Sequence, residues 1–381
     1  MLRTIFTKIA SQIEQKVDEL KFSLKLKFGS SKPLHIVTYR SYGKTNRVYV
    51  KGRVLENKNI VRSGKDHTVF QNVLNMYKRF ETDEVRDVEL KLVLDQKEYF
   101  AKTDEEGYFQ ITIKGTNIID LKDMWHKIPV EIIKAPYGFT HGITAEAEVL
   151  IPPSDAEYGI ISDIDDTIVK TSATNLLSMS RNTFLHNAHT RLPFAGVSEF
   201  YKALLLGRNG KRNNPFFYVS SSPWNLYDLL RDFMDINDIP AGPLLLRDFG
   251  IQNDGTVPKG HMGHKFKEIT QILETYPQLN FILIGDSGQE DPVIYKEVVK
   301  NFPGRILAIY IRDVQHAEKE KKAMVIAHDL KIHNVDMIVV DDTVEASQHA
   351  AANGFIFKES IPVIKEDKKL DKGEKPGKEE L

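Results

Sequence analysis

Hydrophobic and polar positions follow three different periods along this chain. Over residues 3–21 apolar side chains recur every three or four positions, which predicts an amphipathic helix. Between residues 34 and 150 they alternate with polar ones, as at Val48 and Val50, and this period of two predicts strands with one buried and one solvated face. From Gly159 onward short apolar runs alternate with helical stretches, which indicates βα units on a parallel sheet.

These periods divide the chain into four expected parts. They are an amphipathic helix over 1–30, a β-sandwich over 31–152, an α/β domain with a Rossmann-like parallel sheet over 153–360 and a charged tail over 361–381. A helix is expected to interrupt the sandwich around Thr68–Phe80. The stretch from Lys365 to Leu381 holds six Lys and six Asp or Glu with almost no apolar residue, so we expect it to be disordered.

Composition narrows the range of functions. A formal net charge of -1 over 381 residues predicts no general attraction to nucleic acid or membranes, and we expect no nucleic-acid partner. The absence of cysteine excludes disulfides, thiolate catalysis and cysteine-ligated metals. No apolar run has the length of a signal-peptide core or of a membrane span, which predicts a soluble, cytoplasmic protein.

The first helix leaves two interpretations open. Up to Gly29 the chain carries six Lys or Arg against three Asp or Glu, so the helix can lie on an anionic membrane surface as a peripheral contact. Alternatively, its apolar stripe packs on the protein itself or on a partner. The mixed sign of the charges on its polar face favours this second interpretation.

Five strands are expected in the α/β domain, and the first of them ends in acids. The strands are Gly159–Asp163, Phe216–Ser220, Phe281–Gly285, Ile306–Ile311 and Met337–Val340. Because Asp163 and Asp165 are two residues apart, both side chains can lean into one cavity from extended backbone. Two carboxylates held that close have separated pKa values, so one can act as a nucleophile while the other donates a proton.

Three plainer interpretations of this motif are weaker. A calcium loop that starts at Asp163 needs Gly and Glu where Ile168 and Thr174 stand. Helix capping suits Asp166 and Thr167, but it does not explain Asp163, which is still on the strand. In a receiver domain the phosphate-accepting Asp has no acidic partner two residues later.

Further polar groups follow the later strands. Ser220 and Ser221 come at the end of the second strand, where hydroxyls and free backbone N–H groups can hold phosphate oxygens. Lys265 opens a helix, a position where the helix dipole does not favour a cation. Asp286 and Asp291 follow the third strand, and Mg²⁺ prefers such oxygen ligands. The candidate metal ligands are Asp163, Asp165, Asp286 and Asp291, with a backbone carbonyl near Asp165 as a further oxygen.

The order of these motifs resembles the four motifs of the haloacid dehalogenase phosphatase superfamily. It runs Asp163-x-Asp165-x-Thr167, Ser220, Lys265 and then Asp286 with Asp291. Longer strings, among them Ser-Pro-Trp-Asn-Leu-Tyr and Ile-Gly-Asp-Ser-Gly-Gln-Glu-Asp-Pro, resemble the catalytic domain of the actin-patch type phosphatidate phosphatases over about residues 157–357. The chain lacks the proline-rich regions of fungal family members, so the resemblance implies no role at actin patches.

The resemblance implies a function and a role for each residue. It implies a Mg²⁺-dependent phosphatase in which Asp163 forms an aspartyl phosphate and Asp165 gives and takes the proton. The residues that would hold the phosphate are Thr167, Ser220, Ser221 and Lys265. The leading substrate is a lipid phosphate such as phosphatidate. Another phosphomonoester, on a nucleic-acid end or a sugar, is an open alternative, as is a binding protein with a vestigial phosphatase core.

Two further features stay open. Asp341 ends a later strand and is an alternative to Asp286, which we favour because of its place in the order of the motifs. The segment between Asp166 and Phe216 occupies the position of the superfamily's cap and is short for a full lid, which suits a substrate presented from a membrane or a macromolecule. Its His186 and His189 are spaced for a metal but lack a third ligand.

Overall fold

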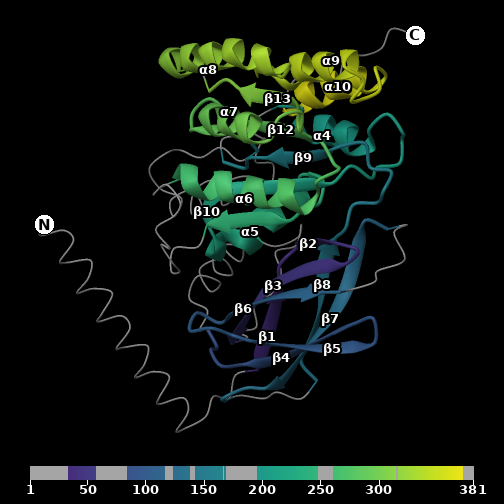
Figure 1. Ribbon diagram of the computed structural model, residues 1–381, viewed down its shortest axis with the longest axis vertical. Helices are drawn as coiled ribbons and strands as arrows, with labels where there is room; N and C mark the ends of the chain where they lie inside the picture. Colours follow the sequence, from purple (N-terminus) through teal and green to yellow (C-terminus); the bar gives the residue numbers. More distant parts are fainter. Residues whose placement is uncertain are drawn as a thin grey trace, which may run out of the picture.

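Strands are present where the hydrophobic pattern predicts them. The computed structural model describes residues 33–56, 84–115, 123–137, 142–165, 167–168, 195–247, 261–314 and 316–371 (Figure 1). The helices expected at 3–21 and around Thr68–Phe80 lie outside these ranges, as do His186 and His189.

Eight strands of the described residues form the N-terminal sheet. They are β1 (Leu34–Thr38), β2 (Ser41–Lys44), β3 (Arg47–Glu56), β4 (Glu89–Leu94), β5 (Lys97–Lys102), β6 (Tyr108–Lys114), β7 (Trp125–Lys134) and β8 (Thr144–Leu150). The hydrogen-bonded order is β1-β3-β2-β8-β7-β4-β5, and β6 pairs with β3. Val48 and Val50 of β3 and Leu90 of β4 point into one shared core. The expected sandwich is therefore a continuous mixed sheet around one core, because β2 pairs antiparallel with β3 and parallel with β8.

Six strands of the described residues form a second sheet, which is parallel. They are β9 (Gly159–Ser162), β10 (Phe216–Pro223), β11 (Leu244–Arg247), β12 (Phe281–Asp286), β13 (Ile306–Arg312) and β14 (Asp336–Val340), in the order β11-β10-β9-β12-β13-β14. Five of them fall on the predicted stretches. β11 is an addition to the prediction, because a run of three leucines carries no period by which strand and helix can be told apart.

Helices cover both faces of the parallel sheet. They are α4 (Val197–Leu206), η1 (Trp224–Leu226), α5 (Tyr227–Ile236), α6 (His261–Thr275), α7 (Asp291–Asn301), α8 (Ala317–Leu330), η2 (Lys331–His333), α9 (Thr343–Ala352) and α10 (Ser360–Asp371). Ile160 of β9 packs in the layer with α4, α5, α9 and α10, whereas Ile161 packs in the layer with α6, α7 and α8. Burial on both faces explains why these strands are continuous apolar runs in the sequence.

The charged C-terminal stretch corrects the prediction of disorder over 361–381. Residues 360–371 form α10, and residues 372–381 lie outside the described part of the chain. Ile364 is fully buried, and a carboxylate oxygen of Asp371 accepts a hydrogen bond of 2.7 Å from the backbone N–H of Gly196, just before α4. Composition did not reveal this helix, because helical stability in proteins comes mostly from tertiary contacts, which one buried side chain and a few polar contacts can supply.

The two sheets belong to one packed unit. The backbone N–H of Arg40 donates to the hydroxyl of Tyr227 at 2.6 Å, and the Arg40 guanidinium forms an ion pair of 3.1 Å with Asp235 of α5. The hydroxyl of Tyr276 donates to the carbonyl of Gly43 in β2 at 2.8 Å. The N-terminal sheet thus contacts the helix that follows β10 and the end of α6 (Figure 1).

Candidate active site

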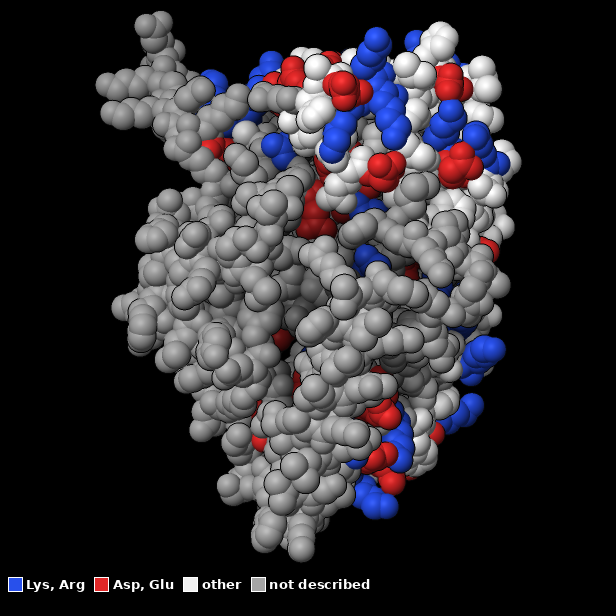
Figure 2. Space-filling view, turned by 90° about the vertical axis from the view of Figure 1, so that its left-hand side faces the viewer, with Lys and Arg blue, Asp and Glu red and all other residues white. Residues whose placement is uncertain are grey.

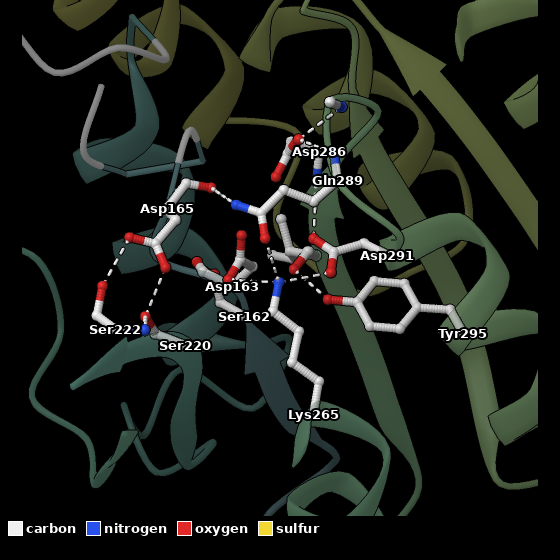
Figure 3. Close-up of polar contacts among 12 residues, drawn as sticks. Ser162, Asp163, Asp165, Ser220, Ser222, Lys265, Asp286, Gln289, Asp291 and Tyr295 are labelled. Atoms are coloured by element: carbon white, nitrogen blue, oxygen red, sulfur yellow. Dashed lines mark hydrogen bonds and ion pairs between the residues drawn. The ribbon is translucent and has the colours of Figure 1, made fainter. Parts of the chain in front are cut away.

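Three adjacent strands bring the predicted site residues to one edge of the parallel sheet. β10, β9 and β12 are neighbours and run in the same direction, so their carboxyl ends meet. Asp163 follows β9, Ser220 lies in β10 and Asp286 ends β12. Figure 3 shows these side chains converging from three strands, together with Lys265 from α6 and Asp291 from α7. Ligands bind at this edge in open α/β sheets.

Asp163 is a buried carboxyl group that faces other charges. It is 1% exposed, and its backbone N–H donates to the carbonyl of Ile284 at 2.8 Å, which fixes its position against β12. Burial raises the pKa of Asp163 well above its ordinary value. The carboxylates of Asp291, Asp165 and Asp286 add to the rise, and the charge of Lys265 opposes it. An additional positive charge is therefore needed to keep Asp163 ionised.

Asp165 is held by two serines of β10. Ser220 Oγ donates to one carboxylate oxygen at 2.6 Å, and Ser222 Oγ donates to the other at 3.0 Å. The backbone carbonyl of Asp165 accepts a hydrogen bond of 3.4 Å from the amide of Gln289. Asp163 and Asp165 both follow β9, but their carboxylates have different neighbours. The carboxylate of Asp165 accepts hydrogen bonds from hydroxyl groups (Figure 3).

Lys265 lies in the first part of α6 and bridges two carboxylates. Its Nζ is 2.8 Å from Asp163 Oδ1 and 2.6 Å from Asp291 Oδ1, and it donates to Gln289 Oε1 at 3.2 Å. Burial alone lowers the pKa of Lys265, but the charges and hydrogen bonds of Asp163 and Asp291 outweigh it and raise that pKa above the ordinary value. Lys265 is therefore a permanent cation of the site.

The loop between β12 and α7 is built around Asp286. One carboxylate oxygen of Asp286 accepts hydrogen bonds from the backbone N–H groups of Gly288 at 2.6 Å and Gln289 at 2.9 Å. The backbone N–H of Asp286 donates to Asp291 Oδ2 at 3.2 Å. A Cβ on Gly285 would lie 2.5 Å from that same oxygen, so only glycine fits beside Asp291. The loop thus orders two of the predicted acids.

Asp163, Asp286 and Asp291 form a group that could hold a metal ion. Each offers one carboxylate oxygen, these oxygens lie within 4.8 Å of one another, and all three residues are buried. In the described part of the site four carboxylates, those of the three acids and of Asp165, face one ammonium group, that of Lys265. A divalent cation fits this excess of buried negative charge and this set of oxygen donors. The donors do not decide which cation binds.

Two predicted phosphate-binding hydroxyls are buried. The buried oxygens of Thr167 and Ser221 have no hydrogen-bond partner among the described residues. Figure 2 shows acidic side chains in a hollow, and above it, on the described part of this face, Lys and Arg side chains mixed with Asp and Glu. Buried hydroxyls that are still free to donate suit the oxygens of an anionic ligand.

The alternative fourth motif around Asp341 has a structural role. Asp341 is exposed, and Asp342 caps α9 by accepting hydrogen bonds from the backbone N–H of Val344 at 2.8 Å and Glu345 at 3.3 Å. Asp342 also pairs with Lys368 of α10. Helix capping explains Asp342 without a ligand, and Asp341 is not among the buried acids that could hold a metal.

Three residues at the site were not among the predicted ones. Ser222 lies two residues after Ser220, so the period of a strand places both hydroxyls on one side, and this signal was available in the sequence. Gln289 links Lys265 to the backbone of Asp165, which no local pattern reveals. His264 precedes Lys265, and burial lowers its pKa to about 4, so its imidazole is neutral at pH 7.

Together these features define an α/β protein with a buried carboxylate and lysine site at the carboxyl ends of its parallel strands. Residues 158–313 match the family described as phosphatidate phosphatase APP1, catalytic domain.

Two curated relatives are similar to the chain over part of their length. Phosphatidate phosphatase APP1 of Saccharomyces cerevisiae is 36% identical over 253 residues, which are 64% of this chain and 39% of that protein. An uncharacterized protein of Schizosaccharomyces pombe is 32% identical over 158 residues, which are 41% of this chain and 25% of that protein. The chain therefore spans less than half the length of either relative that it matches.

Solved structures add no argument about function. The crystal structure of a carbohydrate acetylesterase from Xanthomonas citri covers 81% of this chain and 68% of its own, at 9% identity and a TM-score of 0.24. A putative α-amylase from Salmonella typhimurium gives a TM-score of 0.22 at 9% identity, with 74% of this chain and 50% of its own covered.

Among the described helices, none combines the length and the apolar character needed to cross a membrane.

Proposed function

We propose that this chain is a Mg²⁺-dependent phosphomonoester hydrolase with phosphatidate as its leading substrate. The observation that carries the proposal is the convergence of Asp163, Asp165 and Lys265 with two further buried acids, in a stretch that matches a phosphatidate phosphatase catalytic domain. The order of the strands and motifs supports a haloacid dehalogenase-like domain over 153–360. The substrate lies in a bilayer, so the proposal includes peripheral contact of a cytoplasmic protein with a membrane.

In the proposed reaction Asp163 and Asp165 divide the chemistry. A carboxylate oxygen of Asp163 attacks phosphorus, the P–O bond to the alcohol breaks, and Asp165 donates a proton to the leaving alkoxide. In the second step Asp165 takes a proton from water, the water oxygen attacks the aspartyl phosphate, and inorganic phosphate leaves as Asp163 is restored. Diacylglycerol is the other product when phosphatidate is the substrate.

The remaining residues hold charge and oxygen atoms in place. The Lys265 ammonium group, 2.8 Å from the proposed nucleophile, offers a cation to the transferring phosphoryl oxygens. The hydroxyls of Thr167 and Ser221 are available to donate to the same oxygens. Mg²⁺ bound by Asp163, Asp286 and Asp291 would supply the charge that keeps Asp163 ionised and neutralises the phosphate. In this proposal Asp165 contributes to the metal through its backbone carbonyl, because Ser220 and Ser222 engage its carboxylate.

A phosphate-release screen tests the proposal. The purified chain is offered phosphatidate in vesicles, a sugar phosphate, a 5′-phosphorylated oligonucleotide and 4-nitrophenyl phosphate, with Mg²⁺ and with EDTA. We expect Mg²⁺-dependent release from phosphatidate, and a loss of at least about 10³-fold in Asp163→Asn, whose amide cannot form the acyl phosphate. If the chain prefers a soluble ester, the proposed hydrolase activity stands and phosphatidate is not its leading substrate. Release by Asp163→Asn at near-normal rates would remove the proposed nucleophile.

Asp165→Asn separates the two carboxyl groups. The variant keeps the nucleophile but lacks the proton donor, so we expect it to lose about 10²- to 10⁴-fold on a lipid or alkyl phosphate, whose leaving alkoxide needs a proton. With 4-nitrophenyl phosphate the leaving group is stable without one, so the formation of the aspartyl phosphate, measured as a burst of nitrophenol, is expected to survive. Equal losses on both substrates would contradict the acid role of Asp165.

A further inference from the structure

Lys51 of β3 is a buried cation at the junction of the two sheets. Only 8% of the residue is exposed, and its Nζ lies 4.0 Å from the ring centroid of Trp224 and 5.3 Å from that of Tyr108. An ammonium group removed from water needs compensation, and the negative face of an aromatic ring contributes to it. The side chain of Lys51 is thus directed from the N-terminal sheet at Trp224 of the other domain.

Trp224 is placed where it can transmit this contact to the site. It begins η1 directly after Pro223, the last residue of β10. Ser220 and Ser222, only four and two residues earlier, hold the two carboxylate oxygens of Asp165 at 2.6 and 3.0 Å. A movement of Trp224 therefore displaces the strand end that fixes Asp165.

The segment that contains Trp224 has further contacts with the N-terminal part of the chain. Tyr39, between β1 and β2, stacks on Trp224 with ring centroids 4.8 Å apart and packs on Tyr227 at 4.3 Å. Burial raises the pKa of Glu268 in α6, and the positive charges of Lys267 and Lys51 oppose that rise. The charge of Lys51 is therefore felt in the helix that presents Lys265 as well as at η1.

We propose that Lys51 is a positioning residue, which holds Trp224 so that Ser220 and Ser222 keep the Asp165 carboxylate in place for proton transfer. This inference rests on the proposed function, in which Asp165 protonates the leaving alkoxide. It gives the N-terminal sheet a part in catalysis, because that sheet supplies the cation that fixes the catalytic strand end.

Lys51→Met tests the inference, because it keeps most of the aliphatic stem and removes the charge. We expect kcat for an alkyl phosphate such as a short-chain phosphatidate to fall by about tenfold or more, since small displacements of catalytic groups are costly. For the nitrophenol burst with 4-nitrophenyl phosphate we expect less than about a threefold change, because that step needs no proton donor. KM for both substrates is expected to stay within a factor of two, and Lys51→Arg, which retains the cation, is expected to restore the rate on the alkyl phosphate.

Lys91→Met is the matched control. Lys91 lies in β4 of the same sheet and forms exposed ion pairs with Glu98 and Glu131, so its loss is expected to leave both rates unchanged. If Lys51→Met does not fold, Trp224→Phe, which weakens the cation contact, replaces it. We expect this variant to lose rate on the alkyl phosphate more than on 4-nitrophenyl phosphate, by a smaller factor than Lys51→Met. If Lys51→Met loses rate equally on both substrates, or loses none, the inference is overturned and the proposed hydrolase function stands. A wild-type chain that hydrolyses neither ester overturns the proposed function and this inference together.

Discussion

The chemistry of single residues at this site is set by neighbours from distant parts of the chain. Asp163 and Asp165 are separated by one residue, yet the first faces Lys265 and two further acids while the second accepts hydrogen bonds from two serines. Burial among other acids raises the pKa of Asp163, so a positive charge is needed to ionise it. The same side chain therefore has a different environment at the two positions.

His264 gives a prediction about pH at the residue scale. Burial lowers its pKa from 6.5 to about 4, so the unfolded chain takes up a proton at a higher pH than the folded one. The contribution of His264 to stability is therefore fully present above pH 6.5 and is lost as the pH falls toward 4, at up to about 1.4 kcal/mol per pH unit.

We expect His264→Gln to reduce the fall in unfolding free energy between pH 7 and pH 5, as measured by urea titration. His328→Gln, at an exposed position of α8, is the matched control and is expected to keep the slope of the wild type. If the variant at 264 and the wild type lose the same stability over this range, the buried neutral imidazole is not the cause.

At the scale of elements, the close approach of β12 and α7 makes a prediction about cation binding. Gly285→Ala places a Cβ 2.5 Å from Asp291 Oδ2 and 2.9 Å from Asp291 Cβ, so the Asp291 carboxylate must move. Overpacking of this kind costs about 1–3 kcal/mol in stability. We expect Mg²⁺ affinity, measured by calorimetric titration, to fall by at least about tenfold, which is the effect of about 1.4 kcal/mol.

Gly304→Ala is the control for this substitution. Gly304 has a φ of 74° and no atom within 4 Å of an added Cβ, so alanine there strains the backbone without touching the site. We expect it to lower Tm while leaving Mg²⁺ affinity unchanged. A Gly285→Ala protein with normal Mg²⁺ affinity would argue against Asp291 as a metal ligand.

The helix α10 supplies a second prediction at this scale. Ile364 is fully buried, and its truncation in Ile364→Ala removes core contacts, so we expect a loss of about 2–5 kcal/mol in the free energy of unfolding. Its neighbour Val363 is 51% exposed, and Val363→Ala is expected to change stability by less than about 0.5 kcal/mol. Equal, small effects of both substitutions in denaturant titrations would show that α10 does not contribute to the core.

The whole molecule is expected to unfold in one step. Tyr39 and Tyr108 of the N-terminal part of the chain belong to one core layer of the α/β domain, and Tyr42 and Leu150 belong to the other. Because the two parts share buried side chains, loss of one exposes the core of the other. Scanning calorimetry should therefore give a single peak with calorimetric and van't Hoff enthalpies in agreement. Two separated peaks would show that the sheets unfold independently.

The strands and the chemical groups at their ends can be predicted from the amino-acid sequence. Burial of one face produces alternation in β3, and burial of both faces produces the apolar runs of β9 and β12, so these elements follow from local pattern. Asp163, Asp286 and Ser220 could be assigned to one edge because parallel strands present their carboxyl ends together. The same reasoning failed for α10, whose charged composition hides one buried isoleucine.

Which side chains come into contact depends on the three-dimensional fold. The pairing of Asp165 with Ser220 and Ser222 joins residues more than fifty positions apart, and it depends on the register between β9 and β10. The capping role of Asp342 and the contact of Lys51 with Trp224 likewise depend on how helices and sheets pack. Periodicity records whether a residue is buried, because burial selects for apolar side chains. Periodicity does not say which residue a buried side chain contacts, since many arrangements of the same elements bury the same residues.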